Sequence, residues 1–448
     1  MKKKETYEVI INEVLFPNKG VVYLEDKPVY IKNALKGQKV LIRIEKNKKD
    51  YAEAKIIDVL EKALYETSPL CSHFGECGGC SYQTIPYDMQ LEIKASQVKK
   101  LLDDAGINYE FLGIQGSPLE TAYRNKMEFT FGDDGKTLAL GLHKKGKFYE
   151  VVVTRDCKIV NDDFNKILLS TLIYFAEKEI PHYNKRTHEG FLRHLVVRRT
   201  SKTNEILVNI VTSSQINFDF SEYVEMLNEL KLEGQIKGIL HTINDSLSDV
   251  VQSDKTQILY GQDFITEEIL GLKFKITAFS FFQTNSLSAE NLYSLTREFA
   301  GETKDKVIFD LYSGTGTIAQ IMAPVAKKVI GIEIVEEAVE AARENAKLNN
   351  LDNCEFIAGD VLKKVDELDI KPDIIILDPP RDGIHPKAIG KIINFKAPRL
   401  VYVSCKPTSL ARDLKIFVEN GYEVKKVKCV DMFPHTPHVE TVVLIEKK

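Results

Sequence analysis

The first 60 residues alternate between apolar and polar positions in short runs, which cover residues 6–14, 20–31, 38–47 and 51–60. An alternation of period two is typical of half-buried β-strands, because successive side chains of a strand point to opposite faces. Turn-forming residues separate the runs, among them Pro-Asn-Lys-Gly at positions 17–20. Short strands with regularly spaced turn signals predict a small five-stranded barrel of the OB type over residues 1–60.

The last third of the chain has another pattern, in which short apolar runs alternate with amphipathic helical stretches. The apolar runs cover residues 306–313, 327–334, 354–360, 372–380 and 399–405. Such alternation predicts a doubly wound parallel sheet whose ligand binds beyond the carboxyl ends of the strands. The intervening residues mix both patterns. We therefore expect a multidomain protein with an OB-like β-barrel (1–60), a central α+β domain (61–270) and an α/β doubly wound domain (271–448).

Composition and charge add limited constraints. The chain has 448 residues, of which 44% are hydrophobic and 28% are charged, and this excludes a disordered or fibrous protein. No apolar run approaches the roughly 18 residues of a membrane helix, and the N-terminal segment lacks the apolar core of a secretion signal. Seven cysteines in such a chain favour the reducing cytoplasm. Residues 1–60 hold 13 Lys or Arg against 9 Asp or Glu, which fits either an oligonucleotide-binding face or solvated lysines.

Three cysteines lie within ten residues, at Cys71, Cys77 and Cys80, and glycines between them allow a tight loop. Cys157 is a candidate fourth ligand, which we expect on a distant strand. Four thiolates that converge from a loop and a strand suit a 4Fe–4S cluster or a structural zinc ion, and spacing does not decide between them. The alternative is that these cysteines are small buried hydrophobes, but a glycine-rich polar loop is a poor core.

A basic stretch lies in the central part of the chain. Residues 185–202 contain six Lys or Arg and a single Glu, with Phe191 and histidines between them. The alternation over residues 192–199 predicts a row of basic side chains on one strand face, which is the arrangement that follows a phosphate backbone. A solvated strand face is the alternative. Arginine outnumbers lysine here, and this favours nucleic acid because arginine suits phosphate and base stacking.

Polar residues end successive strands of the predicted parallel sheet. The first strand runs into a turn with Gly314 and Gly316, and Glu333 ends the second strand, where a carboxylate accepts bonds from ribose hydroxyls. Asp360 and Asp378 end the next two strands. The phosphate-binding sequence G-x-G-x-x-G is incomplete, since alanine replaces its last glycine. The spacing therefore favours S-adenosylmethionine, which has no pyrophosphate, over a nicotinamide cofactor.

Two further residues indicate the chemistry. Cys405 lies where a strand meets a helix start beside Lys406, a position at which we expect the thiolate to be favoured. Glu440 heads a final apolar strand. A nucleophile and a carboxylate beside a methyl donor predict methylation of a carbon that needs activation, such as carbon 5 of uracil: thiolate addition at carbon 6 activates it, and a base then removes its proton. Alternatively, Cys405 is a buried strand-end cysteine and Glu440 a capping or surface acid.

With these motifs in place, the chain resembles the TRAM-domain RNA (uracil-5-)-methyltransferases over essentially its whole length. The matching motifs are C-x5-C-x2-C with a distant cysteine, SFFQTN, DLYSGTGTI, DPPR, SCKPTSLARDL and HVETVVL. The resemblance implies a TRAM barrel, a class I methyltransferase domain, an RNA substrate, Cys405 as the nucleophile and Glu440 as the proton acceptor. It implies contacts to S-adenosylmethionine from Gln283, Tyr312, Glu333 and Asp378, with Thr317 and Asp360 as lesser candidates, and a 4Fe–4S cluster on Cys71, Cys77, Cys80 and Cys157.

The resemblance also implies that the product is 5-methyluridine, most often in 23S ribosomal RNA and in some members in transfer RNA. We expect the barrel and the arginine-rich strand to hold an RNA loop whose target uridine turns out of its stack. A monomer is expected. Lys406 stands where the family commonly has Asn, and Ser313 where it often has Cys. The competing hypotheses are an adenine amino-methyltransferase, which Arg381 disfavours because an aromatic is expected there, an RNA-binding iron–sulfur protein without turnover, and a zinc form of the same enzyme.

Overall fold

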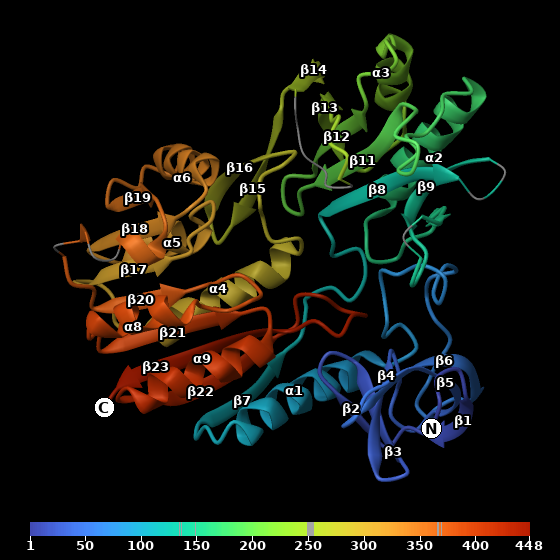
Figure 1. Ribbon diagram of the computed structural model, residues 1–448. Coiled ribbons are helices and arrows are strands. Elements are labelled where there is room, and N and C mark those ends of the chain that lie inside the picture. The colour runs from blue at the N-terminus through green and yellow to red at the C-terminus, as the bar shows by residue number, and fades with distance from the viewer. Residues whose placement is uncertain (134, 136, 148, 249–254, 365–366, 369) are drawn as a thin grey trace.

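The structure, a computed structural model, describes residues 1–448 apart from 134, 136, 148, 249–254, 365, 366 and 369. The strands of the described residues form four sheets (Figure 1). None of the helices in this part of the chain is long and apolar enough to cross a membrane.

The N-terminal strands form one sheet in the order β1–β5–β6–β4–β3–β2. Strand β6 pairs antiparallel with β5 and parallel with β4, and the apolar side chains of the sheet share one core. The predicted strands are confirmed, but six strands are present where five were expected. Their bounds are β1 Thr6–Ile10, β2 Glu13–Leu15, β3 Lys19–Leu24, β4 Lys27–Lys32, β5 Lys39–Asn47 and β6 Ala52–Glu61.

The C-terminal part forms an eight-stranded sheet in the order β19–β18–β17–β20–β21–β23–β22–β7. The first five strands in this order, from β19 through β18, β17 and β20 to β21, are parallel to one another. Strand β23 runs antiparallel to both of its neighbours. The strands are β17 Val307–Leu311, β18 Lys328–Glu333, β19 Cys354–Ala358, β20 Ile374–Leu377, β21 Arg399–Ser404, β22 Tyr422–Val430 and β23 Glu440–Lys447.

Helices cover both faces of this sheet, as the alternation of strands and helices predicts. One apolar core lies under α4, α5 and α6, and the other under α8, α9 and α1 (Figure 1). The helices are α4 Ser286–Ala300, α5 Thr317–Met322 followed by the 3₁₀ turn η1 Ala323–Val325, α6 Glu336–Leu348, α7 Val361–Lys364, α8 Pro386–Asn394 and α9 Pro407–Glu419.

The expected boundary of the C-terminal domain needs correction. Strand β7 (Glu110–Gln115) pairs in parallel with β22 and forms the edge of the C-terminal sheet, although it lies within the expected central domain of residues 61–270. The preceding helix α1 (Tyr87–Asp104) packs on the same sheet. Sequence patterns missed this because β7 is separated by more than 300 residues from β22, the strand with which it pairs, and pairing between distant strands leaves no local signal.

The central part contains a seven-stranded sheet in the order β10–β9–β8–β11–β12–β13–β14. Helices α2 (Asp162–Glu177) and α3 (Ser221–Asn228) share its apolar core (Figure 1). The hairpin β15–β16 (Phe264–Ile269 and Leu272–Thr277) packs against the C-terminal core, so the expected boundary at residue 270 divides a hairpin. The remaining strands are β8 Lys126–Asp133, β9 Leu138–His143, β10 Val151–Val152, β11 Leu192–Arg199, β12 Glu205–Thr212, β13 Gln235–Ile243 and β14 Lys255–Gly261.

Candidate active site

A single large pocket at the carboxyl ends of the parallel strands brings the predicted site residues together. Its volume is about 1570 Å³, which exceeds the roughly 300–1,000 Å³ of an ordinary small-molecule pocket and leaves room for a cofactor together with a nucleotide. All eight residues predicted to bind the cofactor or to carry the chemistry line it, and they come from seven segments of the chain. These residues are Gln283, Tyr312, Thr317, Glu333, Asp360, Asp378, Cys405 and Glu440.

The turn after β17 forms one wall of the pocket. Tyr312, Gly314 and Gly316 all have positive φ, at 69°, 53° and 71°. A Cβ atom on Gly316 would lie 2.4 Å from the Phe356 ring, so this position has no room for a side chain. Left-handed backbone is rare for a residue such as Tyr312 and is concentrated at functional sites. The turn therefore has the tight course that the glycine pattern predicts.

Glu333 already accepts three hydrogen bonds from the backbone. Its Oε2 accepts from Gly314 N at 3.0 Å, and its Oε1 accepts from the nitrogens of Ile334 at 2.9 Å and Val335 at 3.0 Å. A carboxylate has about four acceptor sites. Only one site is then left for a ribose hydroxyl, so a bond to a second hydroxyl requires Glu333 to release one backbone group.

Two buried polar atoms of the same wall have no hydrogen-bond partner within the described residues, namely Asp310 Oδ1 and Ser313 Oγ. Both residues line the pocket. Asp310 Oδ2 accepts from Ala319 N at 2.9 Å, which fixes the carboxyl. Burial, with smaller contributions from Asp378 and Glu333, raises the pKa of Asp310 well above its ordinary value. Unpartnered buried polar atoms indicate a polar ligand, which fits a cofactor with amino, carboxyl and ribose groups.

Cys405 and Glu440 lie at the same end of neighbouring strands, and both line the pocket. Cys405 follows the last residue of β21 and is half-buried, whereas Glu440 begins β23 and is buried. The antiparallel register pairs Ser404 with Thr441, so the next position brings Cys405 opposite Glu440. Directly opposite residues of an antiparallel pair have Cβ atoms about 4.5–5.5 Å apart. The thiol and the carboxyl therefore lie on the same side of the sheet, in one pocket.

The electrostatics of Cys405 differ from the expectation. Burial, followed by Glu440 and Asp378, raises the pKa of Cys405 to about 11, and Arg381 opposes the rise. The prediction that the thiolate is favoured was wrong for the pocket without ligands, because desolvation and two carboxyl groups outweigh the helix start. The cation that lowers the pKa of Cys405 is Arg381, which lines the pocket after the Asp378-Pro-Pro turn.

The carboxyl groups of the pocket are also perturbed. Burial, and then the charge of Asp378, raises the pKa of Glu440 to about 8, while Arg381 acts in the opposite direction. Burial raises the pKa of Asp378 to about 7. Both groups therefore exchange protons near neutral pH, which is the range in which a carboxyl serves as a proton acceptor in catalysis.

The arginine-rich strand does not form an exposed basic row, so that prediction was wrong. Strand β11 lies between β8 and β12 in the centre of its sheet, and Arg193 and Arg198 are 4% and 3% exposed. Arg193 donates to the carbonyls of Asn244 and Ser246. Arg198 donates to Ala278 O at 3.1 Å and to Ser280 O. The loops of residues 244–246 and 278–280 cover these guanidinium groups, which donate to their backbone carbonyls.

Arg198 thereby supports the loop that contains Gln283. Asn125, just before β8, supports it from the same side, because its Nδ2 donates to Gln283 O at 2.9 Å and its N donates to Thr284 O at 2.8 Å. The segment SFFQTN is thus fixed between the central sheet and the C-terminal sheet. This explains how Gln283, which lies outside the parallel strands, reaches the pocket.

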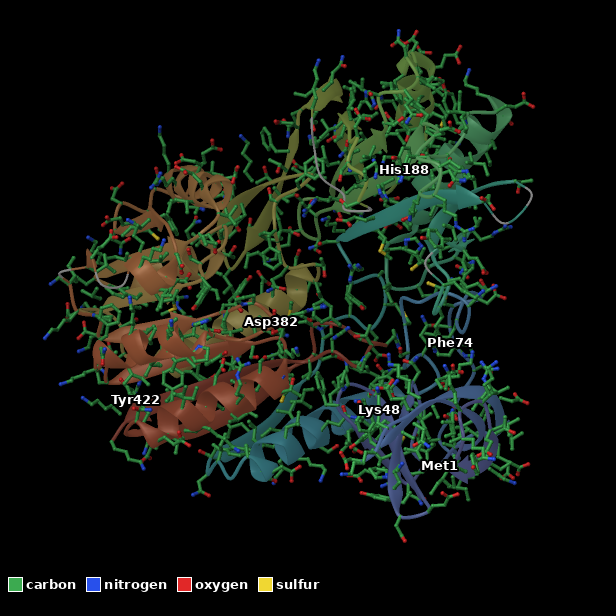
Figure 2. All side chains as sticks on the ribbon, viewed as in Figure 1. Met1, Lys48, Phe74, His188, Asp382 and Tyr422 are labelled. Carbon is green, nitrogen blue, oxygen red and sulfur yellow. The ribbon has the colours of Figure 1, made fainter. Side chains whose placement is uncertain are left out.

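The loop of Cys71, Cys77 and Cys80, which Figure 2 marks at Phe74, meets the segment of Cys157, because Cys71 Sγ donates to Asp156 O at 3.6 Å. Cys157 lies in the loop after β10, not on a strand. Burial, and then the charges of Cys80, Cys71 and Cys77, raises the pKa of Cys157 to about 12, so the four sulfurs lie within electrostatic range of one another. Four thiols fit zinc or a 4Fe–4S cluster as donors. Within the described residues, however, no group of three or more His, Cys, Asp or Glu side chains is placed to hold a metal ion.

Sequence reasoning missed several residues around the pocket. The missed residues that line it are Tyr293 of α4, Arg124, Phe433, Thr436 and His438. Their positions depend on contacts between distant segments.

A second group of missed residues, on helix α1, has a recognisable signal in the sequence. Polar residues recur on the buried face of α1, where Gln90 and Lys94 are 0% exposed and Gln97 is 6% exposed. Polar side chains at the helical spacing of a core-facing stripe indicate specific buried partners.

Comparisons with known proteins agree with this geometry. The family model for tRNA (uracil-5-)-methyltransferase matches residues 86–448, and the TRAM domain model matches residues 2–57. A protein of Clostridium tetani described as an uncharacterized RNA methyltransferase is 57% identical over 100% of this chain and 99% of its own length. A second one, of Caldanaerobacter subterraneus, is 55% identical over the full length of both chains.

Among solved structures, the Pyrococcus abyssi tRNA (uracil-54, C5)-methyltransferase in complex with S-adenosyl-L-homocysteine is similar to this chain with a TM-score of 0.78 and 28% identity, covering 98% of this chain and 100% of that one. A family model that matches four fifths of the sequence and relatives that match it from end to end give one assignment: the chain belongs to the tRNA (uracil-5-)-methyltransferase family and carries a TRAM domain.

Proposed function

We propose that this protein transfers a methyl group from S-adenosylmethionine to carbon 5 of a uridine in RNA, by way of a transient adduct on Cys405. The observation that carries the proposal is the placement of Cys405 opposite Glu440 in a pocket that also contains Gln283, Tyr312, Glu333 and Asp378. Thr317 and Asp360 line the same pocket and are lesser candidates for cofactor contacts. The structure of the Pyrococcus abyssi relative with S-adenosyl-L-homocysteine supports the choice of cofactor.

The residues of the pocket divide the reaction between them. The Cys405 thiolate adds to carbon 6 of uracil, which forms a C–S bond and makes carbon 5 nucleophilic. When bound, S-adenosylmethionine would supply the methyl group that carbon 5 takes and would leave as S-adenosylhomocysteine. Glu440 then takes the proton from carbon 5, and the electrons of that C–H bond re-form the double bond as the C–S bond breaks. Arg381 assists the first step because it lowers the pKa of Cys405.

The identity of the RNA is the finer part of the proposal. The resemblance found in the sequence favours 23S ribosomal RNA. Transfer RNA is the second candidate, because the family model and the Pyrococcus abyssi relative both concern tRNA methylation. Deletion of the gene, followed by mapping of 5-methyluridine in both RNA classes, distinguishes them: the class that loses the modified nucleoside is the substrate.

The four cysteines carry a separate prediction. We propose that Cys71, Cys77, Cys80 and Cys157 hold a 4Fe–4S cluster, with zinc as the alternative. The number of thiols supports this, as does the contact of Cys71 Sγ with Asp156 O, which brings the loop beside the Cys157 segment. No step of methyl transfer depends on the cluster.

The activity is tested with RNA and S-adenosylmethionine that carries a labelled methyl group. The wild-type protein is expected to label uridine at carbon 5, and RNA that contains 5-fluorouridine is expected to remain covalently attached, since fluorine cannot leave as a proton. Cys405→Ala should lose both signals. Cys354→Ala, which changes another half-buried cysteine at the start of β19, should keep both. Turnover by Cys405→Ala would refute the proposal.

A further inference from the structure

The segment of residues 431–438, which we call the base segment, links β22 to β23 and leads directly to Glu440. It lines the pocket through Phe433, Thr436 and His438. The rings of Phe433 and His438 meet edge to face with their centroids 6.2 Å apart. The course of the base segment therefore determines where Glu440 enters the pocket.

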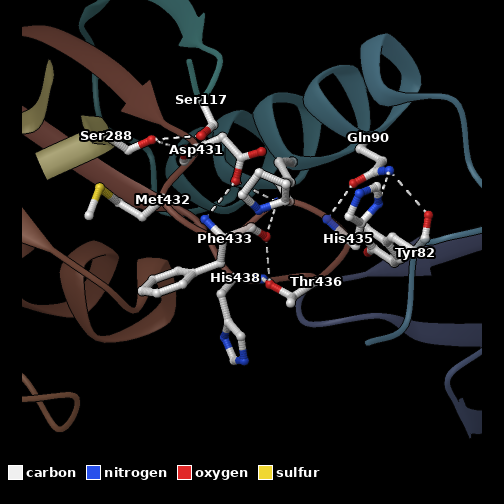
Figure 3. Close-up of polar contacts among 12 residues, drawn as sticks. Tyr82, Gln90, Ser117, Ser288, Asp431, Met432, Phe433, His435, Thr436 and His438 are labelled. Atoms are coloured by element: carbon white, nitrogen blue, oxygen red, sulfur yellow. Dashed lines mark hydrogen bonds and ion pairs between the residues drawn. The ribbon is translucent and has the colours of Figure 1, made fainter. Parts of the chain in front are cut away.

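Parts of the chain that precede the central sheet hold the base segment in place (Figure 3). The backbone nitrogens of Ser81 and Tyr82 both donate to His435 O at 2.9 Å. The Tyr123 hydroxyl donates to Pro434 O at 3.0 Å. Every one of these groups is more than 300 residues away from its partner in the sequence. The base segment thus takes its shape from tertiary contacts rather than from local turn chemistry.

Helix α1 makes the most buried of these contacts. Lys94 Nζ lies 2.7 Å from Asp431 Oδ1, and both side chains are 0% exposed. Lys94 Nζ also donates to Phe433 O at 3.0 Å, while Phe433 N donates to Asp431 Oδ1 at 3.1 Å. The ammonium and the carboxylate therefore bind the two peptide groups on either side of Phe433 and fix the direction of the chain there.

The same face of α1 adds two further bonds. Tyr87, Gln90 and Lys94 follow the spacing i, i+3, i+7, which places them on one side of the helix. The Tyr87 hydroxyl donates to Asp431 Oδ2 at 3.0 Å. Gln90 Oε1 accepts from His435 N at 2.8 Å. The helix thus binds the base segment at its first residue and in its middle.

Stability alone is a weak reason for such an arrangement. Removing two charges from water costs several kcal/mol per ion, and well-packed apolar residues often serve a core equally well. A buried ion pair does impose a defined geometry on the groups it bonds. We propose that Lys94 is a positioning residue for Glu440: through Asp431 and the Phe433 carbonyl it holds the base segment so that the Glu440 carboxyl faces Cys405. This inference rests on the proposed function, because Glu440 matters here as the acceptor of the carbon 5 proton.

The test separates the two chemical steps in single-turnover experiments with RNA and S-adenosylmethionine. Lys94→Met should form the covalent Cys405–RNA adduct at close to the wild-type rate, since it leaves β21 unchanged. It should release methylated RNA at least about tenfold more slowly than the wild type, because a misplacement of a catalytic group by about 1 Å lowers the rate by up to about 10²-fold. The matched control is Lys99→Met on the same helix, whose ion pair with Asp103 is exposed, and it should behave as the wild type.

A second comparison tests whether the effect acts through Glu440. In a Glu440→Gln background, Lys94→Met should slow adduct release no further, because residues that act as one unit are not additive. If Lys94→Met fails to fold because it leaves the Asp431 charge unpaired, Lys94→Met/Asp431→Asn removes that charge and should show the same split between formation and release.

Two results would overturn the inference. One is release of adduct at the wild-type rate by a folded Lys94 variant. The other is an equal loss in formation and release, which indicates a general structural defect. If the wild-type protein itself formed no adduct, the proposed function would fail instead, so the two failures are distinguishable.

Discussion

Cys405 and Glu440 are cross-strand neighbours, one position beyond the Ser404–Thr441 pair of β21 and β23. The antiparallel direction of β23 relative to β21 makes this pairing possible. A parallel strand would present its carboxyl end to the pocket, whereas β23 presents its first residue, Glu440. The acid is therefore fixed by strand pairing on one side and by the base segment on the other.

Replacement of Glu440 by Gln should block the second half of the reaction. We expect methylated adduct to accumulate on Cys405 and turnover to fall by about 10²–10⁴-fold, the usual contribution of a positioned base. Denaturing gel electrophoresis of labelled RNA measures the adduct. Loss of the adduct together with turnover would instead assign Glu440 to an earlier step.

The release step should depend on pH in a defined direction. The pKa of Glu440 is raised to about 8, so the carboxyl is mostly protonated below that pH and cannot accept a proton. Adduct release should rise with pH and reach half of its maximum near pH 8. Single-turnover rates over a pH series measure this. A flat profile would contradict the assignment of Glu440 as the base.

The same shift predicts how stability varies with pH. Because folding raises the pKa of Glu440 from 4.5 to about 8, its contribution to stability is complete below about pH 4.5 and is lost as the pH rises through about 8. The unfolding temperature of the wild type should therefore fall relative to that of Glu440→Gln across this window. A constant difference between the two proteins would show that folding does not perturb Glu440.

Gly316→Ala should disturb the turn that closes on the cofactor. The position has a φ of 71°, and the new methyl group would lie 2.4 Å from Phe356. A loss of about 1–3 kcal/mol in the free energy of unfolding is expected, with weaker binding of S-adenosylmethionine in calorimetry. Gly390→Ala is the control, because that glycine lies in α8 with no atom within 4 Å of the added carbon, and alanine favours a helix by about 0.5–1 kcal/mol.

Arg198→Lys distinguishes a structural arginine from one that binds RNA. The substitution keeps the charge but loses the planar group that donates to Ala278 O and Ser280 O. We expect a higher KM for S-adenosylmethionine, since the loop with Gln283 loosens, and an unchanged salt dependence of RNA binding. Replacing a phosphate-binding arginine by Met would lower the slope of log K against log salt by about 1. Because Arg198 binds backbone carbonyls instead, Arg198→Met should leave that slope unchanged.

Cys157→Ser tests the cluster. Anaerobically purified wild-type protein is expected to contain iron and to absorb visible light, and the variant should lose both, because Cys157 would supply the one ligand outside the loop. Cys354→Ser should keep them. Colourless wild-type protein with zinc would favour the alternative, and protein without either metal would contradict both.

Local sequence patterns were sufficient to predict the strands and helices and the reactive side chains at the strand ends. The period-two alternation of residues 1–60 and the strand–helix alternation after residue 306 follow from side-chain geometry within a few residues. Glu333, Asp378 and Cys405 each close a strand of the parallel sheet, and parallel strands end at one edge, so their shared pocket follows from the sequence.

Pairing between distant segments decided the rest. It placed β7 in the C-terminal sheet, covered Arg198 with the loop of Ala278 and Ser280, and buried Cys405 beside carboxyl groups, which raises its pKa. It also set Lys94 against Asp431, 337 residues away, and no local pattern carries that information because burial and partner identity arise only when separate elements pack together.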